Sequence, residues 1–197
     1  MLDRTFPPHV DAASIPPYKL RHAGPVLIVG SAEQAVDDVQ RASDIYPSAS
    51  LIAINRSAAQ WKADLIVSID RRPAKAWRDA QEQRFGKEHF TYHGGRIGSG
   101  RHDDFPWFDY WWPGLHGNGG TSAWLAAKIA RTVGFGPIVL CGAPIDNSKY
   151  FDGHPGWSRR EADEIDKYRN VIASEWWMHP HVRSMSGWTM QLLGAPT

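Results

Sequence analysis

Gly117-Asn118-Gly119-Gly120-Thr121-Ser122 is followed by an alanine-rich run, 123–133, and then by the apolar segment 138–141. Glycines let a backbone approach a ligand closely, because no Cβ intervenes. A helix that begins at such a turn directs free N–H groups and the positive end of its dipole toward the turn, where a phosphate or carboxylate can bind. The order turn, helix, strand therefore predicts an α/β domain that binds an anion. The predicted contacts are Gly119, Gly120, Thr121 and Ser122.

The spacing of this turn differs from that of the standard phosphate-binding motifs. The chain contains no G-x-x-x-x-G-K-[ST], and no G-x-G-x-x-G follows its first apolar segment. The same residues also suit a plain helix N-cap, in which a Thr121 or Ser122 hydroxyl accepts a backbone N–H bond. The sequence leaves both interpretations open.

Apolar segments and helical patterns alternate on either side of this stretch. Short apolar runs at 25–30, 51–55 and 65–70 are typical of buried parallel strands, and 88–93 and the region around 182 are weaker candidates. Helices are expected over 32–43, 57–61, 73–84, 159–177 and 187–193. This alternation predicts one Rossmann-like α/β domain, residues 25–197, with a mostly parallel sheet and helices on both faces. Residues 1–24 are expected to be an N-terminal extension.

Composition narrows the class of protein. The 197 residues carry 42% hydrophobic and 22% charged side chains, as ordinary globular proteins do. No apolar run approaches the ~18 residues of a membrane helix, and residues 1–17 hold no signal-peptide core. The single cysteine, Cys141, excludes an intrachain disulfide framework and favours a cytoplasmic location for the protein.

The net charge of +1 gives no general argument for nucleic-acid binding, although basic residues outnumber acidic ones between 71 and 101. That excess suits an anionic ligand or a solvated helix face.

Polar residues follow four of the predicted strands. In a parallel sheet all carboxyl ends lie on one edge, where ligands bind, so residues distant in sequence meet there. Asn55 suits a base or a ribose, because its amide both donates and accepts hydrogen bonds. Asp70 and Asp146 suit a hydroxyl, a metal ion or the role of a base, and each also suits a turn or helix cap. The predicted nucleotide contacts at these strand ends are Gly30, Ser31, Asn55 and Gly142.

The segment Phe105–Pro113 contains six aromatic residues in nine positions and has no regular alternation. Long irregular loops in compact domains are usually functional or disordered, and aromatic residues argue against disorder. We expect this segment to form a lid or acceptor wall rather than a core strand. Packing against the sheet and a dimer contact are the alternatives. The residues assigned to the lid are Trp107, Tyr110, Trp111, Trp112 and, from a later loop, Tyr150.

His154 stands in a loop sequence rich in glycine and proline, 150–157. Imidazole titrates near neutral pH and can remove a proton from a hydroxyl nucleophile, so His154 is the candidate general base. A structural or surface histidine is the alternative. No group of histidines has recognisable metal-ligand spacing, and no G-x-S-x-G elbow is present.

Several of these motifs together resemble a known family. The run Gly120-Thr121-Ser122, the helix, the strand 138–142, Ile145-Asp146 and Gly153-His154 are similar to the bacterial sialyltransferases that extend lipooligosaccharide. They are also similar to a wider group that contains motility accessory factors, hydroxymethylpterin pyrophosphokinase-like proteins and small phage-encoded relatives. The resemblance implies a Rossmann-like domain that binds a nucleotide or nucleotide-sugar. It also implies that Thr121, Ser122 and Asn55 hold the nucleotide and that His154 is the general base.

The sequence therefore leaves three alternative functions, of which the transferase is favoured. The first is a glycosyltransferase-like transferase that acts on a small-molecule, glycan or nucleotide acceptor. The second is a pyrophosphokinase-like enzyme, with Mg²⁺ held by carboxylates such as Asp70 and Asp146, although no motif indicates the metal. The third is a non-enzymatic accessory protein, for instance of a phage, whose Trp-rich segment binds a partner. Nucleic-acid binding and a homo-oligomer are compatible with the sequence.

Overall fold

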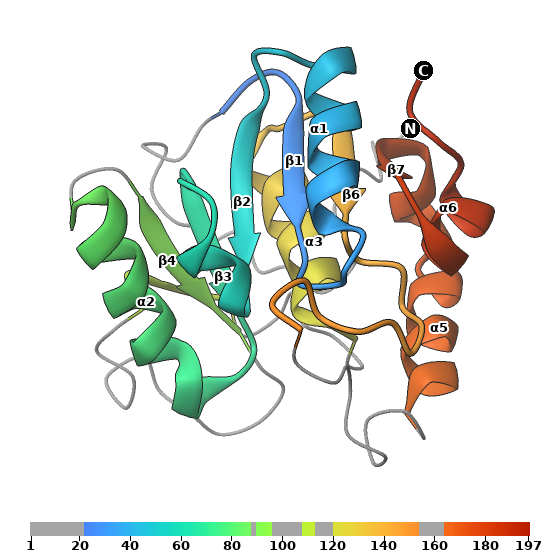
Figure 1. The fold of residues 1–197 in the computed structure, drawn as a ribbon. Coiled ribbons are helices and arrows are strands. Elements are labelled where there is room, and N and C mark those ends of the chain that lie inside the picture. Colours follow the sequence, from blue (N-terminus) through green and yellow to red (C-terminus); the bar gives the residue numbers. More distant parts are fainter. Residues whose placement is uncertain (1–21, 88–89, 96–107, 113–119, 154–163) are drawn as a thin grey trace.

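The structure is a computed structural model that describes residues 22–87, 90–95, 108–112, 120–153 and 164–197. Within these residues seven strands form one sheet, and every neighbouring pair is parallel. Their order is β5-β4-β3-β2-β1-β6-β7, and most of them are labelled in Figure 1. The predicted α/β class is confirmed. The strands are β1 (Val26–Val29), β2 (Ser50–Ile54), β3 (Leu65–Ser68), β4 (Thr91–Gly94), β5 (Tyr110–Trp111), β6 (Ile138–Cys141) and β7 (Val182–Ser184).

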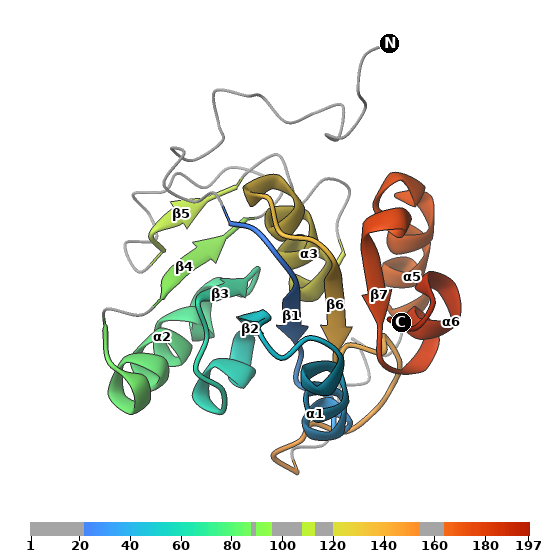
Figure 2. The ribbon, with the colours of Figure 1, turned by 90° about the horizontal axis from the view of Figure 1, so that it is seen from above.

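Helices cover both faces of the sheet, as predicted. Figure 2 shows α1 and α2 on one face and α3 on the other. At the β7 edge, α5 and α6 lie side by side (Figures 1 and 2). The helices are α1 (Ala35–Ile45), α2 (Arg71–Phe85), α3 (Ser122–Val133), α5 (Ile165–Ser174) and α6 (Gly187–Leu193), with the 3-10 helices η3 (Asn55–Ala59) and η6 (Trp176–His181).

The strands are apolar on both faces because both faces are covered. In β1, Val26 and Ile28 pack in the core cluster that contains α3, whereas Leu27 packs in the cluster with Ala42 of α1. Successive side chains of a strand point to opposite faces, so one continuous apolar run fills two cores. This explains why β1, β3 and β6 are completely buried.

The chain reverses its direction across the sheet at β1. After β1 it proceeds through β2, β3, β4 and β5 to one edge, then returns to place β6 on the other side of β1. The register aligns Val29 of β1 with Cys141 of β6. The crevice outside the carboxyl ends of β1 and β6 is therefore a topological switch point, where open α/β sheets bind their ligands.

The aromatic segment differs from the lid that the sequence predicts. Residues 110–111 form β5 beside β4, and Trp112 is only 2% exposed and packs in the core. Its indole Nε1 donates to Nδ1 of the buried His93, 3.0 Å away. Tyr110 also packs against this core. The lid prediction is therefore wrong for Tyr110 and Trp112. A hydrogen-bonded indole can be buried, and a two-residue parallel pairing leaves no alternating pattern to detect in the sequence. Trp107 lies outside the described residues.

Other boundaries shift by a few residues. The first helix begins at Ala35 rather than at residue 32, because the backbone of Ala32 is extended and bridges to Tyr150. The described helix in the predicted stretch 159–177 is α5, and α5 ends at Ser174, before η6. Within the expected N-terminal extension, His22 donates its backbone N–H to Val133 and stacks on Phe135. Residues 1–21 are outside the described part.

Candidate ligand-binding site

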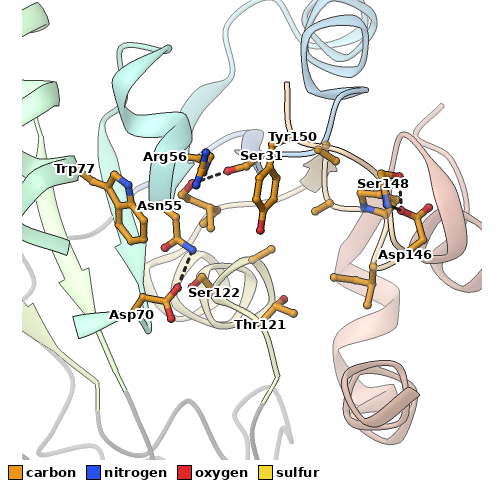
Figure 3. A pocket seen from close by; sticks show the side chains of 18 of the residues that line it. Ser31, Asn55, Arg56, Asp70, Trp77, Thr121, Ser122, Asp146, Ser148 and Tyr150 are labelled. Atoms are coloured by element: carbon orange, nitrogen blue, oxygen red, sulfur yellow. Dashed lines mark hydrogen bonds between the residues drawn. The ribbon is translucent and has the colours of Figure 1, made fainter. Parts of the chain in front are cut away.

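A pocket of about 370 Å³ lies at the switch point. Its walls come from the carboxyl ends of β1, β2, β3 and β6, the start of α3 and the loop that follows β6 (Figure 3). That volume is within the usual range of small-molecule sites. It is lined by Gly30, Ser31, Ala32, Ile54, Asn55, Arg56, Asp70, Pro73, Trp77, Thr121, Ser122, Ala123, Gly142, Ala143, Pro144, Ile145, Asp146, Ser148 and Tyr150.

The first turn of α3 combines a cap with two unpartnered donors. Thr121 is the N-cap, and its Oγ1 accepts the N–H of Trp124 at 3.3 Å. The N–H groups of Ser122 and Ala123 have no hydrogen-bond partner among the described residues. Both residues line the pocket. The cap and the anion-site interpretations of the sequence are thus compatible: the threonine caps the helix, and no described residue occupies the next two N–H groups.

The Ser122 side chain joins two pocket walls. Its Oγ accepts the backbone N–H of Ile69, just after β3, at 3.1 Å. Ser122 is only 4% exposed, so this bond is shielded from water. The bond fixes the start of α3 against the end of β3, and the hydroxyl hydrogen stays available to donate.

Asn55 and Asp70 form a hydrogen-bonded pair at the ends of β2 and β3. Nδ2 of Asn55 donates to Oδ2 of Asp70 at 3.0 Å. The other amide atom of Asn55, Oδ1, is buried and has no partner among the described residues. A buried acceptor without a donor is costly. The pair therefore suits a ligand that presents hydroxyl or N–H donors. Figure 3 shows both side chains beside Ser122.

The wall after β6 is a tightly fixed turn. Gly142 has φ +59°, and a Cβ at this position would stand 2.4 Å from Cβ of Ala35, so no larger residue fits. Ile145 has φ +52°, and its carbonyl accepts from Nε of Arg169 at 3.1 Å. A β-branched residue at positive φ is a true outlier, and such strain concentrates at functional sites. In the described residues, the two non-glycine residues with positive φ are Ile145 and Asn55, and both line the pocket.

Asp146 follows this turn and binds the next part of the loop. Its Oδ1 accepts the backbone N–H of Ser148 at 2.9 Å and also the Ser148 hydroxyl. Nε2 of Gln34, just before α1, donates to the same hydroxyl oxygen at 3.1 Å. In this arrangement Asp146 orders the loop, although it also borders the pocket (Figure 3).

The loop beyond Ser148 is attached to the opposite wall. Tyr150 forms an antiparallel bridge with Ala32, and the N–H of Phe151 donates to the Ser31 carbonyl at 3.0 Å. The guanidinium of Arg56 lies 4.5 Å from the Tyr150 ring centroid, and its Nη1 is 2.6 Å from Oδ2 of Asp152. Tyr150 therefore borders the pocket from a loop that is bonded both to the residues after β1 and to Arg56.

The structure brings most of the predicted site residues together. Gly120 is buried beside this group and precedes Thr121. Tyr110 and Trp112 do not line the pocket, whereas Gly119 and His154 are outside the described residues. The predicted residues that line the pocket are Gly30, Ser31, Asn55, Asp70, Thr121, Ser122, Gly142, Asp146 and Tyr150.

Sequence reasoning missed three polar or aromatic pocket residues. Arg56 follows Asn55 directly, so the rule that selected Asn55 could have selected it too. Trp77 lies on α2, one turn after Pro73, on the helix face that continues from the end of β3. Ser148 had no signal in the sequence, because its position depends on the turn at Ile145.

Charge in the pocket is mixed. The charged side chains that line it in the described chain are one cation, Arg56, and two carboxylates, Asp70 and Asp146.

Across the described ranges, no three His, Cys, Asp or Glu side chains group closely enough to hold a metal ion. The helices in those ranges are too short or too polar to cross a membrane.

Comparison with known proteins finds one distant likeness. No protein-family model matches the chain, and no curated protein matches it. Among solved structures, the chain is similar to a MAf glycosyltransferase from Magnetospirillum magneticum, with a TM-score of 0.46 and 19% sequence identity. The likeness covers 64% of this chain and 23% of that chain. The chain therefore corresponds to less than a quarter of that protein, and a likeness at this level assigns no function.

Proposed function

We propose that this chain is a glycosyltransferase-like protein that depends on a nucleotide or nucleotide-sugar, and that the pocket holds the nucleotide. The observation that carries the proposal is that two unlike groups lie at the switch point. One is the pair of N–H groups at the start of α3 that have no partner among the described residues, and the other is the Asn55–Asp70 pair. The first group suits an anion, and the second suits a ligand with hydrogen-bond donors. A nucleotide presents both.

The expected placement follows from these contacts. The phosphate lies at the N–H groups of Ser122 and Ala123, where the helix dipole favours negative charge. A ribose hydroxyl or base N–H donates to Oδ1 of Asn55, which has no partner among the described residues. Trp77 is half-buried at the side of the pocket and provides an aromatic surface for a base or sugar ring.

The catalytic part of the proposal concerns His154. It follows Gly153 in the chain, directly after the loop residues that border the pocket. An acceptor hydroxyl is a poor nucleophile until a base removes its proton as the new bond forms, and imidazole can do this near neutral pH. We assign that role to His154, and we assign the ordering of the loop to Asp146.

A second candidate is a Mg²⁺-dependent pyrophosphokinase. It is favoured by one observation: Asp70 and Asp146, the carboxylates that this chemistry needs, both line the pocket. In that case ATP, rather than a nucleotide-sugar, is the donor, and turnover requires the metal.

A ligand panel tests both candidates. Thermal unfolding is measured with nucleoside mono- and diphosphates, ATP and nucleotide-sugars, with and without Mg²⁺. A ligand at 100 times its Kd adds about 2.7 kcal/mol to the free energy of unfolding, which raises Tm measurably. A shift with a nucleotide-sugar that is independent of Mg²⁺ supports the transferase, and a Mg²⁺-dependent shift with ATP supports the kinase. The absence of any nucleotide shift overturns both.

A further inference from the structure

Arg56 is the single cation among the described side chains that line the pocket. It comes from η3, directly after Asn55, and Figure 3 shows it above Asn55 and near Tyr150. A phosphate in this pocket also meets the carboxylates of Asp70 and Asp146, which repel it. Besides the backbone N–H groups at the start of α3, the Arg56 guanidinium is the positive group among the described lining residues that can offset this repulsion.

The guanidinium is held in one orientation. Its Cζ lies over the Tyr150 ring, 4.5 Å from the centroid, and Nη1 donates to Oδ2 of Asp152 at 2.6 Å. A guanidinium carries five N–H donors, and a contact with an aromatic ring does not use them as hydrogen bonds to an acceptor atom. Within the described part of the chain, Asp152 is the one acceptor that reaches these groups.

The Arg56–Asp152 pair is also accessible to solvent. The side chains are 30% and 41% exposed, and such pairs contribute only about 0–1 kcal/mol to stability. A ligand that replaces water at the remaining N–H groups therefore does not have to break a strong internal bond. Arginine binds phosphate through two parallel N–H bonds, which gives both affinity and orientation.

We propose that Arg56 binds the phosphate of the pocket's ligand and makes the pocket select phosphorylated ligands over neutral ones, while Tyr150 and Asp152 hold the guanidinium in position. This inference rests on the proposed function, because it names the group that recognises the anionic part of the same ligand. It adds a specificity-determining residue that no sequence motif marks.

Calorimetry on a matched ligand pair tests this inference. Each nucleoside and its 5′-diphosphate are titrated into the wild type and into Arg56→Gln, which keeps the length of the side chain but removes its charge. We expect the diphosphate to bind at least about tenfold more weakly to the variant, the usual effect of losing a hydrogen bond to a charged group. The nucleoside affinity should change less than about twofold, within the spread of a lost neutral contact.

Arg84→Gln is the matched control. Arg84 donates to the Ala59 carbonyl of the same η3 helix but does not line the pocket. The control should leave both affinities within about twofold, because the Arg84 guanidinium bonds the Ala59 carbonyl and Oε1 of Gln60, neither of which lines the pocket. Where a nucleoside alone binds too weakly to measure, inorganic pyrophosphate is titrated in place of the nucleoside and its diphosphate. Its affinity should also fall at least about tenfold in Arg56→Gln.

The outcomes separate this inference from the proposed function. Equal diphosphate affinity in wild type and Arg56→Gln overturns the inference and leaves the proposed function intact. An equal loss of affinity for nucleoside and diphosphate also overturns it, because Arg56 would then maintain the shape of the pocket rather than bind the phosphate. Pyrophosphate binding that depends on Arg56, without nucleotide binding, overturns the proposed function alone. No binding of nucleotide or pyrophosphate to the wild type overturns both.

Discussion

The carboxylate of Asp38, which is 0% exposed, accepts the backbone N–H of Gly142 at 2.9 Å. The same oxygen accepts the hydroxyl of Ser186 at 2.5 Å, and the other carboxylate oxygen pairs with Arg41. Asp38 belongs to α1, on the face of the sheet opposite to α3. A residue outside the pocket thus fixes the turn after β6 that forms one pocket wall.

Replacing Asp38 should destabilise the fold. Asp38→Ala leaves the buried Gly142 N–H and the half-buried Ser186 hydroxyl without this acceptor, and a buried group without a partner costs about 1–3 kcal/mol. We expect a loss of about 3 kcal/mol in the free energy of unfolding, measured by urea denaturation. The control is Asp37→Ala, an exposed change one residue earlier in the same helix, with an expected loss under about 1 kcal/mol. Equal losses in the two variants would show that the buried bonds contribute nothing specific.

The anion site at α3 can be tested through its backbone. Ser122→Pro removes one of the two N–H groups that have no partner in the described part of the chain. Proline is tolerated here because Ser122 is the first helical residue and Thr121 before it is extended, with φ −97° and ψ 164°. Ser122→Ala is the matched control, since it also loses the hydroxyl but keeps the N–H. We expect the proline variant to bind a nucleoside diphosphate about tenfold more weakly than the alanine variant. If the two affinities agree, phosphate does not bind at this helix start.

Acid should destabilise the protein through His93. Burial lowers the pKa of His93 to about 3, with a further contribution from His22, because a charged ring would lie in the core. The Trp112 indole donates to Nδ1, so the proton is on Nε2, which reaches Thr91 Oγ1 at 2.7 Å. Below about pH 6.5, His93 binds a proton in the unfolded chain but stays neutral in the folded chain. Stability is therefore complete above pH 6.5 and falls as the pH drops toward 3, by about 1.4 kcal/mol per unit.

Urea midpoints at pH 7 and pH 5 measure this effect. The expected loss attributable to His93 is about 2 kcal/mol over that interval. Burial also lowers the pKa of His22, so His22→Gln is placed in both proteins that are compared. His93→Asn in that background should lose less stability between the two pH values. An unchanged loss would mean that another group causes the acid sensitivity.

The general-base assignment predicts a separation of kinetic effects. His154→Ala should lower kcat by about 10²- to 10⁴-fold, the usual contribution of a positioned base. Nucleotide affinity should stay within about threefold, because the base acts on the acceptor rather than on the nucleotide. Turnover with the identified donor and calorimetry with the nucleotide measure the two quantities. Near-normal turnover would contradict the assignment, and a large loss in Asp70→Asn instead would favour the kinase.

Much of the fold can be predicted from the sequence, because buried parallel strands leave a simple pattern. The apolar run 138–141 and the last helix, 187–193, have the predicted bounds. Asn55 and Asp70 line one pocket for the predicted reason, because parallel strands end on one edge, and Ser122 joins them from the start of α3. These inferences need only local composition and the topology of the sheet.

The rest depends on contacts between distant segments. The sequence predicts a lid position for Trp112, because its partner, His93, cannot be recognised from sequence spacing. Asp38 has the pattern of an exposed acid in a first helical turn, and it is buried because Gly142 and Ser186 supply donors. Ser148 reaches the pocket through the unusual backbone of Ile145. In each case a tertiary hydrogen bond overrides a local preference.

The position of β1 between β2 and β6 has a consequence for how the protein folds. The pairing of β1 with β2 closes a short loop, whereas the pairing with β6 joins opposite halves of the chain and costs more loop entropy. Gly142 and the residues after it reach the pocket only when that second pairing is made. We therefore expect the pocket to be completed late in folding, so a nucleotide ligand should slow unfolding without accelerating refolding.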